Sequence, residues 1–352
     1  MKIFGLALAL AASPSAARDF SSAAAGSASA PFLKLGVDSR VEAMGGAGAA
    51  TARDAGALYW NPGALMEAGL QSAVFSREEY LAGTSLNYAA YSRAISAGVF
   101  GVSIQELSVG SIGGTDANGA DNGSFSPYDL ALSLGYASHI VSDELSVGAS
   151  AKFIQSKILG NARTFAFDGG VSYSLTSNVK LAFVAANVGG RLQYERNREE
   201  LPLLFRAGIG VTPRDSWELS AEAVAARDAN PALALGTEWR TQGDADWVLS
   251  LRGGINTATV SGISGISGLS AGFGIARKDI GVDYAVRPFG GIGIAHHFSI
   301  VWKFDGARRG KRAQFRRWAS STEDAHAQAR MAAPRPAKVQ LRDFSAAQPT
   351  NG

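Results

Sequence analysis

The stretch from Ile294 to Phe304, IAHHFSIVWKF, alternates between two kinds of side chain. One set is large and apolar, apart from one histidine: Ile294, His296, Phe298, Ile300, Trp302 and Phe304. The other set is smaller or polar: Ala295, His297, Ser299, Val301 and Lys303. Successive side chains of a β-strand point to opposite faces, so the stretch predicts a strand with one strongly apolar face.

The same period of two recurs through most of the chain. In the segment 128–138, Tyr, Leu, Leu, Leu and Tyr alternate with Asp, Ala, Ser, Gly and Ala. We count fourteen such segments, which begin near Leu70, Ser85, Ala97, Tyr128, Leu145, Thr164, Val179, Leu203, Trp217, Ala232, Asp246, Leu269, Ile280 and Ile292. The pattern therefore predicts an all-β protein.

Alternation alone fits either a soluble sandwich or a membrane barrel, and three features favour the barrel. Aromatic residues lie near the segment ends, as in interfacial girdles. The second face is rich in Gly, Ser and Ala with few charges, which suits a lumen. Ten residues at ~3.3 Å each, tilted by ~40°, cover about 25 Å, the height of a membrane barrel's apolar band.

The lengths of the connections support the same interpretation. The long connections, 108–127, 189–202 and 256–268, all follow odd-numbered segments and therefore lie at one end. Outer-membrane barrels have short periplasmic turns and longer outer loops. We therefore predict a 14-stranded antiparallel transmembrane β-barrel over residues 69–304, with outer-membrane lipid around it and both termini periplasmic.

The first residues predict export. Lys2 precedes the apolar run Ile3–Ala12, and small residues follow up to Ala17. This is the pattern of a secretory signal peptide, which we place at residues 1–17. The alternative is an N-terminal membrane anchor, but about ten apolar residues are too few to cross ~30 Å of hydrocarbon as a helix.

Residues 18–68 do not alternate, and they carry a specific resemblance. The stretch 32–65, FLKLGVDSRVEAMGGAGAATARDAGALYWNPGAL, is similar to the N-terminal signature of the PorV/PorQ family of bacterial outer-membrane barrels, which resemble FadL-type channels. Further matches lie at 200–202, 268–272 and 282–290. One departure is Asn61-Pro62-Gly63-Ala64-Leu65, where the family has Asn-Pro-Ala-Gly-Leu.

The resemblance implies a FadL-like barrel in which residues 18–68 form a linker and a luminal plug. Glycines would let the plug backbone approach the inner wall, Asn61 would cap a turn, and Pro62 would end a preceding helix. The predicted plug motif consists of Gly45, Gly46, Gly48, Trp60, Asn61 and Pro62. The family relation also implies a non-enzymatic accessory of type IX secretion, whose partners would be secreted cargo or secretion-system proteins. The alternative is a FadL-like channel for hydrophobic small molecules.

Charged residues on the smaller face should line the lumen. We predict this position for Asp168, Arg206, Glu218, Arg252 and Asp283. Mixed signs inside a barrel favour structural ion pairs, and the alternative is a polar path for a solute. We predict no catalytic residue, metal or cofactor, because the chain lacks cysteine and the adjacent His296 and His297 point to opposite faces.

The C-terminal tail, residues 305–352, differs in composition from the rest. It carries ten Lys or Arg and four acidic residues, a net charge of +6, whereas the whole chain carries +3. Such a tail would attract anionic head groups, peptidoglycan or a partner protein. The alternative is a disordered periplasmic tail without a specific role. Nucleic acid is not an expected partner.

Overall fold

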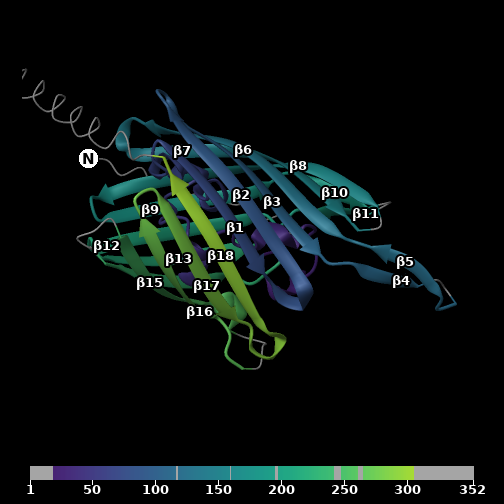
Figure 1. The fold of residues 1–352 in the computed structure, drawn as a ribbon. Coiled ribbons are helices and arrows are strands. Elements are labelled where there is room, and N and C mark those ends of the chain that lie inside the picture. The colour runs from purple at the N-terminus through teal and green to yellow at the C-terminus, as the bar shows by residue number, and fades with distance from the viewer. Residues whose placement is uncertain are drawn as a thin grey trace, which may run out of the picture. The chain divides into compact units, whose positions relative to one another are not determined.

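Fourteen strands form one closed antiparallel barrel (Figure 1). The computed structural model describes residues 19–304 apart from 116–117, 159, 195–196, 242–246 and 261–264. The barrel strands are β1 (Gln71–Glu79), β2 (Thr84–Ile95), β3 (Gly98–Val109), β6 (Tyr128–Ile140), β7 (Ser142–Lys157), β8 (Asn161–Thr176), β9 (Val179–Val188), β12 (Leu204–Arg214), β13 (Trp217–Ala226), β14 (Ala232–Arg240), β15 (Trp247–Asn256), β16 (Leu269–Arg277), β17 (Ile280–Pro288) and β18 (Ile294–Lys303). Strands β1 and β18 pair with each other and close the sheet. The predicted fold class is confirmed.

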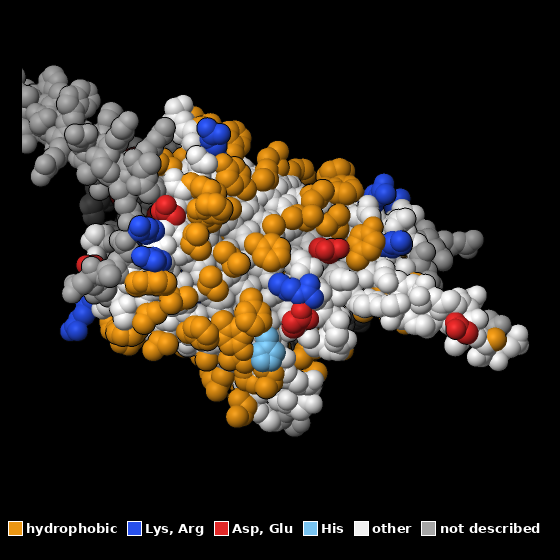
Figure 2. All heavy atoms as spheres, in the orientation of Figure 1, with side chains coloured by type: hydrophobic (Ala, Val, Ile, Leu, Met, Phe, Trp, Pro, Cys, Tyr) orange, Lys and Arg blue, Asp and Glu red, His pale blue; other side chains and the backbone are white. Residues whose placement is uncertain are grey.

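The alternation of side chains separates the outside of the barrel from its lumen. Outward positions hold large apolar residues that stay exposed, for example Leu134, Phe165 and Leu251, each close to 60% exposed. Figure 2 shows that such side chains cover most of the visible wall. Inward positions hold mainly Ala, Gly, Ser and buried charged residues. This is the reverse of a soluble protein and fits a wall that faces lipid.

The two ends of the barrel differ, as the connection lengths predict. One end, here called the short-turn end, carries tight links such as Ser177-Asn178 between β8 and β9. The other, the long-loop end, carries two additional hairpins that the alternation did not predict. These are β4 (Ile112–Thr115) with β5 (Asp121–Phe125), and β10 (Arg191–Tyr194) with β11 (Asn197–Glu200).

The N-terminal segment, residues 19–68, runs through the lumen. It contains η2 (Ser22–Ala24), η3 (Pro31–Lys34), α1 (Ser39–Ala43), α2 (Ala57–Trp60) and η4 (Pro62–Glu67). A further short helix, η5 (Leu81–Gly83), links β1 to β2, and η6 (Thr257–Thr259) and η7 (Gly290–Ile292) lie at the long-loop end. No helix among the described residues is both long and apolar enough to cross a membrane.

Apolar side chains of the N-terminal segment pack against the inner wall in two main clusters. Phe32 and Leu33 pack with Ile154 of β7 and with Leu192 and Leu201 near the long-loop end. Leu58, Trp60 and Leu65 pack with Val74 of β1 and Tyr88 of β2. These contacts leave the centre of the lumen filled rather than open.

The first and the last described residues lie at opposite ends of the barrel. Phe304, the last described residue, donates its amide to Gln71 O at the short-turn end. Phe20, in contrast, lies at the long-loop end, where its amide donates to Arg227 O at 2.6 Å. The N-terminal segment therefore enters the lumen over the long-loop rim, and the prediction that both termini are periplasmic stays untested. The signal peptide (1–17) and the tail (305–352) lie outside the described residues, and these two predictions stay untested.

Candidate functional site

The N-terminal segment and the wall around it form the candidate site. At the long-loop end, Ser29 donates its amide to Glu200 O at 2.9 Å, and Ala28 bridges the same residue. At the other end, Ala68 leads directly into β1, which starts at Gln71. The segment thus crosses the lumen from one end to the other, and any solute that passes must pass beside it.

Gly45 brings the segment against the wall. Its φ of +72° is a conformation that glycine adopts without steric cost. A Cβ at this position would lie 2.7 Å from Ile255 O and 2.9 Å from Leu235 O, so a side chain does not fit. Gly46 also has positive φ, +81°. Gly48 does not approach the wall: a Cβ there would meet the Trp60 ring at 2.6 Å, so this glycine permits a contact within the segment.

Asn61 and Pro62 form the turn between α2 and η4. The Asn61 side chain accepts from Gly63 N at 2.9 Å and donates to Ala49 O at 2.8 Å and to Val171 O at 3.1 Å. Pro62 is the first residue of η4, where its missing N–H costs nothing. Gly63, the residue that departs from the family pattern, lies so close to β8 that a Cβ would be 2.7 Å from Gly170 O.

Trp60 links the segment to itself and to the wall. Its indole Nε1 donates to Asp38 Oδ2 at 2.7 Å, and the guanidinium of Arg206 lies 4.9 Å from its ring centroid. Asp38 also caps α1 by accepting from Val41 N at 2.8 Å. Burial, together with the nearby negative charge of Asp54, raises the pKa of Asp38 to about 7.

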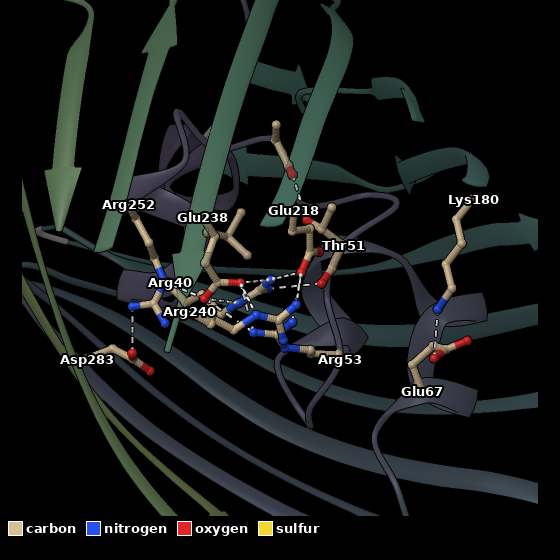
Figure 3. A network of polar contacts seen from close by, with 12 residues as sticks. Arg40, Thr51, Arg53, Glu67, Lys180, Glu218, Glu238, Arg240, Arg252 and Asp283 are labelled. Carbon is tan, nitrogen blue, oxygen red and sulfur yellow. Dashed lines mark hydrogen bonds and ion pairs between the residues drawn. The ribbon is translucent and has the colours of Figure 1, made fainter. Parts of the chain in front are cut away.

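Two arginines of the segment are held by two glutamates of the wall (Figure 3). Arg40 contacts Glu218 at 3.1 Å and Glu238 at 3.0 Å, and Arg53 contacts the same two carboxylates at 2.8 and 2.9 Å. Glu218 and Glu238 are direct cross-strand neighbours on β13 and β14. Like charges in that position repel each other, so the arginines make the pair stable. We call these four residues the arginine–glutamate clamp.

Further charges extend the clamp along the inner wall. Arg252 of β15 bonds Glu238 at 2.8 Å and Asp283 of β17 at 2.6 Å, and Arg240 contacts Glu218 at 3.3 Å. All of these carboxylates have little or no exposure to solvent. The network therefore joins strands β13, β14, β15 and β17 and attaches the N-terminal segment to them.

The other predicted lumen residues are paired as well. Asp168 contacts Lys152 at 2.8 Å, and Arg206 contacts Glu222 at 2.7 Å. All five residues that we expected to line the lumen lie on the inner face of the wall and make ion pairs. This arrangement agrees with structural ion pairs and gives no sign of an unpaired polar path among the described residues.

Sequence analysis did not predict the charged residues of the N-terminal segment that form these ion pairs. Arg40 and Arg53 complete the clamp, and Glu42 pairs with Arg287, which also binds Glu78. A signal was present: Arg40, Glu42 and Arg53 are among the charged residues of a mostly small and apolar segment that was assigned to the lumen. Charges buried in this way must be paired, so partners on the wall could have been expected.

Two cavities adjoin the segment. One, of about 260 Å³, lies between the segment and the long-loop ends of β12 to β15. Its lining combines Leu35, Trp60, Leu204, Val224 and Ala226 with Lys34, Glu42, Arg206, Asn230, Asn256 and Arg287. The other, of about 750 Å³, also lies at the long-loop end and is lined by Pro31, Val109, Pro127, Tyr128, Ile158 and Tyr194 together with polar residues such as Asp129 and Lys157. Both linings are therefore partly apolar and partly polar.

The described part of the chain contains no cluster of three or more His, Asp or Glu residues placed to hold a metal ion. His296 Nδ1 lies 2.7 Å from the hydroxyl of Tyr284 on the outer face, whereas His297 is buried in the lumen near Glu78. The two histidines therefore lie on opposite faces, as predicted.

Comparison with known proteins identifies the fold but not the family. No protein-family model matches the chain, and no curated protein matches it. Among solved structures, the chain is similar to the Ralstonia pickettii toluene transporter TbuX, with a TM-score of 0.52 and 17% identity over 76% of this chain and 98% of that one. The Pseudomonas putida toluene transporter TodX matches with a TM-score of 0.52 and 13% identity over 76% and 96%. A Pseudomonas aeruginosa FadL homologue matches with a TM-score of 0.52 and 13% identity over 76% and 98%.

These likenesses show a FadL-type barrel fold. At such low identity they carry the fold alone. None of them is described as a PorV or PorQ protein, so the resemblance of residues 32–65 to that family stays a prediction.

Proposed function

We propose that this chain is a non-enzymatic outer-membrane channel for hydrophobic small molecules, with the N-terminal segment as its plug. The structurally similar proteins include two toluene transporters and a FadL homologue. This similarity favours the channel hypothesis over the secretion accessory. The outward apolar surface and the pattern of residues 1–17 support an outer-membrane location.

One observation carries the proposal: a cavity with a large apolar part in its lining lies between the plug and the wall. Leu35, Trp60 and Leu204 provide contact area for an apolar solute. Ligand sites usually combine such a lining with a few polar groups that fix orientation. Here all three cations of the lining are neutralised: Arg206 by Glu222, Arg287 by Glu42 and Glu78, and Lys34 by Asp228.

The larger cavity at the long-loop end would receive the solute first. Its lining of Pro31, Tyr128 and Ile158 is apolar enough to draw a hydrophobic molecule from the outer leaflet or from a loop surface. From there the solute would move to the inner cavity. Because the plug fills the remaining lumen, release toward the short-turn end would require the plug to shift.

Plug movement can be tested by fixing the plug to the wall. Ala49 Cβ lies 3.3 Å from the position that a Cβ would take on Gly208 of β12, close to the spacing of about 3.8 Å in disulfides. The chain has no cysteine, so Ala49→Cys with Gly208→Cys introduces the single possible bridge. Whole cells that express this variant instead of their own hydrophobic-solute channels would be supplied with labelled toluene and a labelled fatty acid.

We expect the oxidised variant to lose uptake and a reductant to restore it. Each single-cysteine variant serves as the control, because it carries the same local change without the bridge. Equal uptake by the oxidised and reduced forms would show that the plug does not have to move. Uptake no greater than in cells without the barrel would refute the channel itself.

A second candidate function is the secretion accessory that the PorV/PorQ resemblance implies. One observation favours it: two of the three long connections fold into hairpins, β4–β5 and β10–β11, that extend the long-loop end (Figure 1). Such hairpins would offer a surface to secreted cargo or to secretion-system proteins. Deletion of residues 112–125 should abolish cargo retention under this hypothesis and leave solute uptake unchanged under the channel hypothesis.

A further inference from the structure

The outer wall of β18, β1, β2 and β3 carries polar side chains where the rest of the barrel is apolar. Its outward residues include Arg77 and Glu79 on β1, Asn87 on β2, Glu106 on β3 and His296 on β18. They are direct cross-strand neighbours, since Arg77 pairs with Asn87, Asn87 with Glu106, and Glu79 with His296. We call this group the polar wall. In Figure 2, charged side chains and a histidine interrupt the apolar surface.

The apolar band is unusually short at this wall. On β1, only Ala73 and Phe75 face outward between Gln71 and Arg77. Six residues at ~3.3 Å each and a tilt of ~40° give about 15 Å of height, against about 25 Å for a typical apolar band. On β8, by contrast, outward apolar residues extend from Phe165 to Leu175, which corresponds to about 25 Å by the same estimate.

A bilayer of ordinary thickness would therefore bring hydrocarbon against charged groups at this wall. Charged side chains on the lipid face of a barrel are destabilising, most of all near the midplane. Either the bilayer becomes thinner here or a protein surface covers the wall. The charges help to distinguish these cases, because Glu79 and Glu106 are balanced by Arg77 and Arg93. A wall without net charge does not attract anionic lipid head groups.

The polar wall is instead complementary to a copy of itself. Arg77 bonds Glu79 at 2.6 Å, whereas Glu106 has no ion-pair partner within the described ranges. A two-fold axis parallel to the barrel axis would place Arg77 of one copy near Glu106 of the other. The two residues lie two strands apart, so a tilt of ~40° separates them by about 6 Å in height, within reach of an arginine side chain.

We infer that the barrel forms a two-fold dimer through the wall of β18, β1, β2 and β3. Ala73 and Ala89 are small outward residues of this wall, and their direct cross-strand neighbours Tyr91 and Phe75 supply exposed aromatic surface beside them. Such an isologous contact buries the glutamates and arginines of both copies against each other and removes them from lipid. The inference does not depend on the transported solute.

Single cysteines can detect this contact, because the chain has none of its own. Ala89→Cys places a thiol at the centre of the polar wall. Ala223→Cys on β13 is the matched control, since it is also an outward alanine but lies seven strands away around the barrel. The full-length protein would be oxidised in native membranes at low expression, and the covalent dimer would be quantified on a gel.

We expect a dimer of twice the chain mass for Ala89→Cys and none above background for Ala223→Cys. Arg77→Glu in the Ala89→Cys background should lower the dimer yield at least roughly tenfold, because like charges then meet across the contact. Adding Glu106→Arg should restore it, since the reversed charges are again complementary. Rescue by the second reversal shows that both variants fold.

Three outcomes would overturn the inference. Ala89→Cys and Ala223→Cys could give equal dimer yields, which indicates random collision. The Ala89→Cys product could have a mass other than twice the chain, which indicates a different protein partner. Finally, the barrel could remain monomeric in nanodiscs while the bilayer is thinner beside β1 than elsewhere. That result would indicate that the membrane adapts to the polar wall.

Discussion

The arginine–glutamate clamp allows one substitution to separate plug release from barrel unfolding. Glu238 is fully buried and accepts hydrogen bonds from Arg40, Arg53 and Arg252. Two of these arginines belong to the N-terminal segment, so Glu238→Gln removes a charge that both of them share. The variant leaves four arginines of the network, including Arg240, with only Glu218 and Asp283 as carboxylate partners.

The expected effect is large for the plug and small for the barrel. Removing one partner of a buried ion pair costs about 3–5 kcal/mol, and we take the lower value because glutamine keeps one oxygen acceptor. Since about 1.4 kcal/mol corresponds to a factor of ten, release of the plug should become more than roughly a hundredfold more frequent. The β-ladder does not use the Glu238 side chain, so the barrel should remain folded.

Limited digestion with trypsin measures this release. Arg40 and Arg53 are trypsin sites inside the lumen, and cleavage there requires that the segment leave the wall. When opening is fast relative to cleavage, the cleavage rate follows the population of the open form. The matched control is Glu67→Gln, which removes a partly exposed contact between plug and wall, the 2.8 Å pair with Lys180. Such an exposed pair contributes about 1 kcal/mol or less.

We expect cleavage at Arg40 and Arg53 to accelerate strongly in Glu238→Gln and at most slightly in Glu67→Gln, with unchanged β-structure by circular dichroism in both. If Glu238→Gln were cleaved no faster than the unaltered protein, the clamp would not be what holds the plug. If its β-structure were lost, plug and barrel would form one cooperative unit, and the separation of the two would be refuted.

Three further predictions concern the plug. Gly45→Ala should weaken plug docking by about 1–3 kcal/mol, because the site needs positive φ and has no room for a Cβ, and faster trypsin cleavage at Arg40 would show it. The pKa of Asp38 is raised to about 7 in the folded protein. The stability that the protonated carboxyl contributes is therefore fully present below the ordinary aspartate pKa near 4 and is lost as the pH rises through 7. Unfolding temperatures at pH 5 and pH 8 should differ more for the unaltered protein than for Asp38→Asn. Trp60→Phe should cost about 1–3 kcal/mol, since it leaves one Asp38 oxygen without its indole donor, and thermal unfolding at pH 8 would measure this loss.

The barrel could be predicted from the sequence because each strand carries its own signal. Outward side chains face an apolar environment and inward side chains face the plug. Apolar and small or polar residues therefore alternate in every spanning segment. The predicted starts at Tyr128, Val179, Trp217, Ala232 and Leu269 coincide with the starts of strands in the structure. The even strand count also places Phe304 at the short-turn end, as observed.

The remaining features depend on contacts between distant residues. The hairpin β4–β5 has the sequences IGGT and DNGSF, which contain no apolar alternation because both faces are exposed. The clamp joins Arg40 and Arg53 to residues more than 160 positions away, and no local pattern identifies such partners. The path of Phe20 over the long-loop rim likewise rests on contacts with Arg227 and Phe205.

The barrel and the plug are therefore stabilised by different interactions, and this difference bears on how a solute could pass. The wall is held by a closed ladder of backbone hydrogen bonds, which has no free edge at which it could open. The plug is held by side chains: the clamp, the Arg287 pairs with Glu42 and Glu78, and two apolar clusters. Buried ion pairs add little net stability compared with apolar packing, but they specify one docked arrangement. A plug fixed in this way can be displaced at a free-energy cost far below that of opening the wall. Under the proposed channel function, the plug and not the strands would therefore be the part that moves.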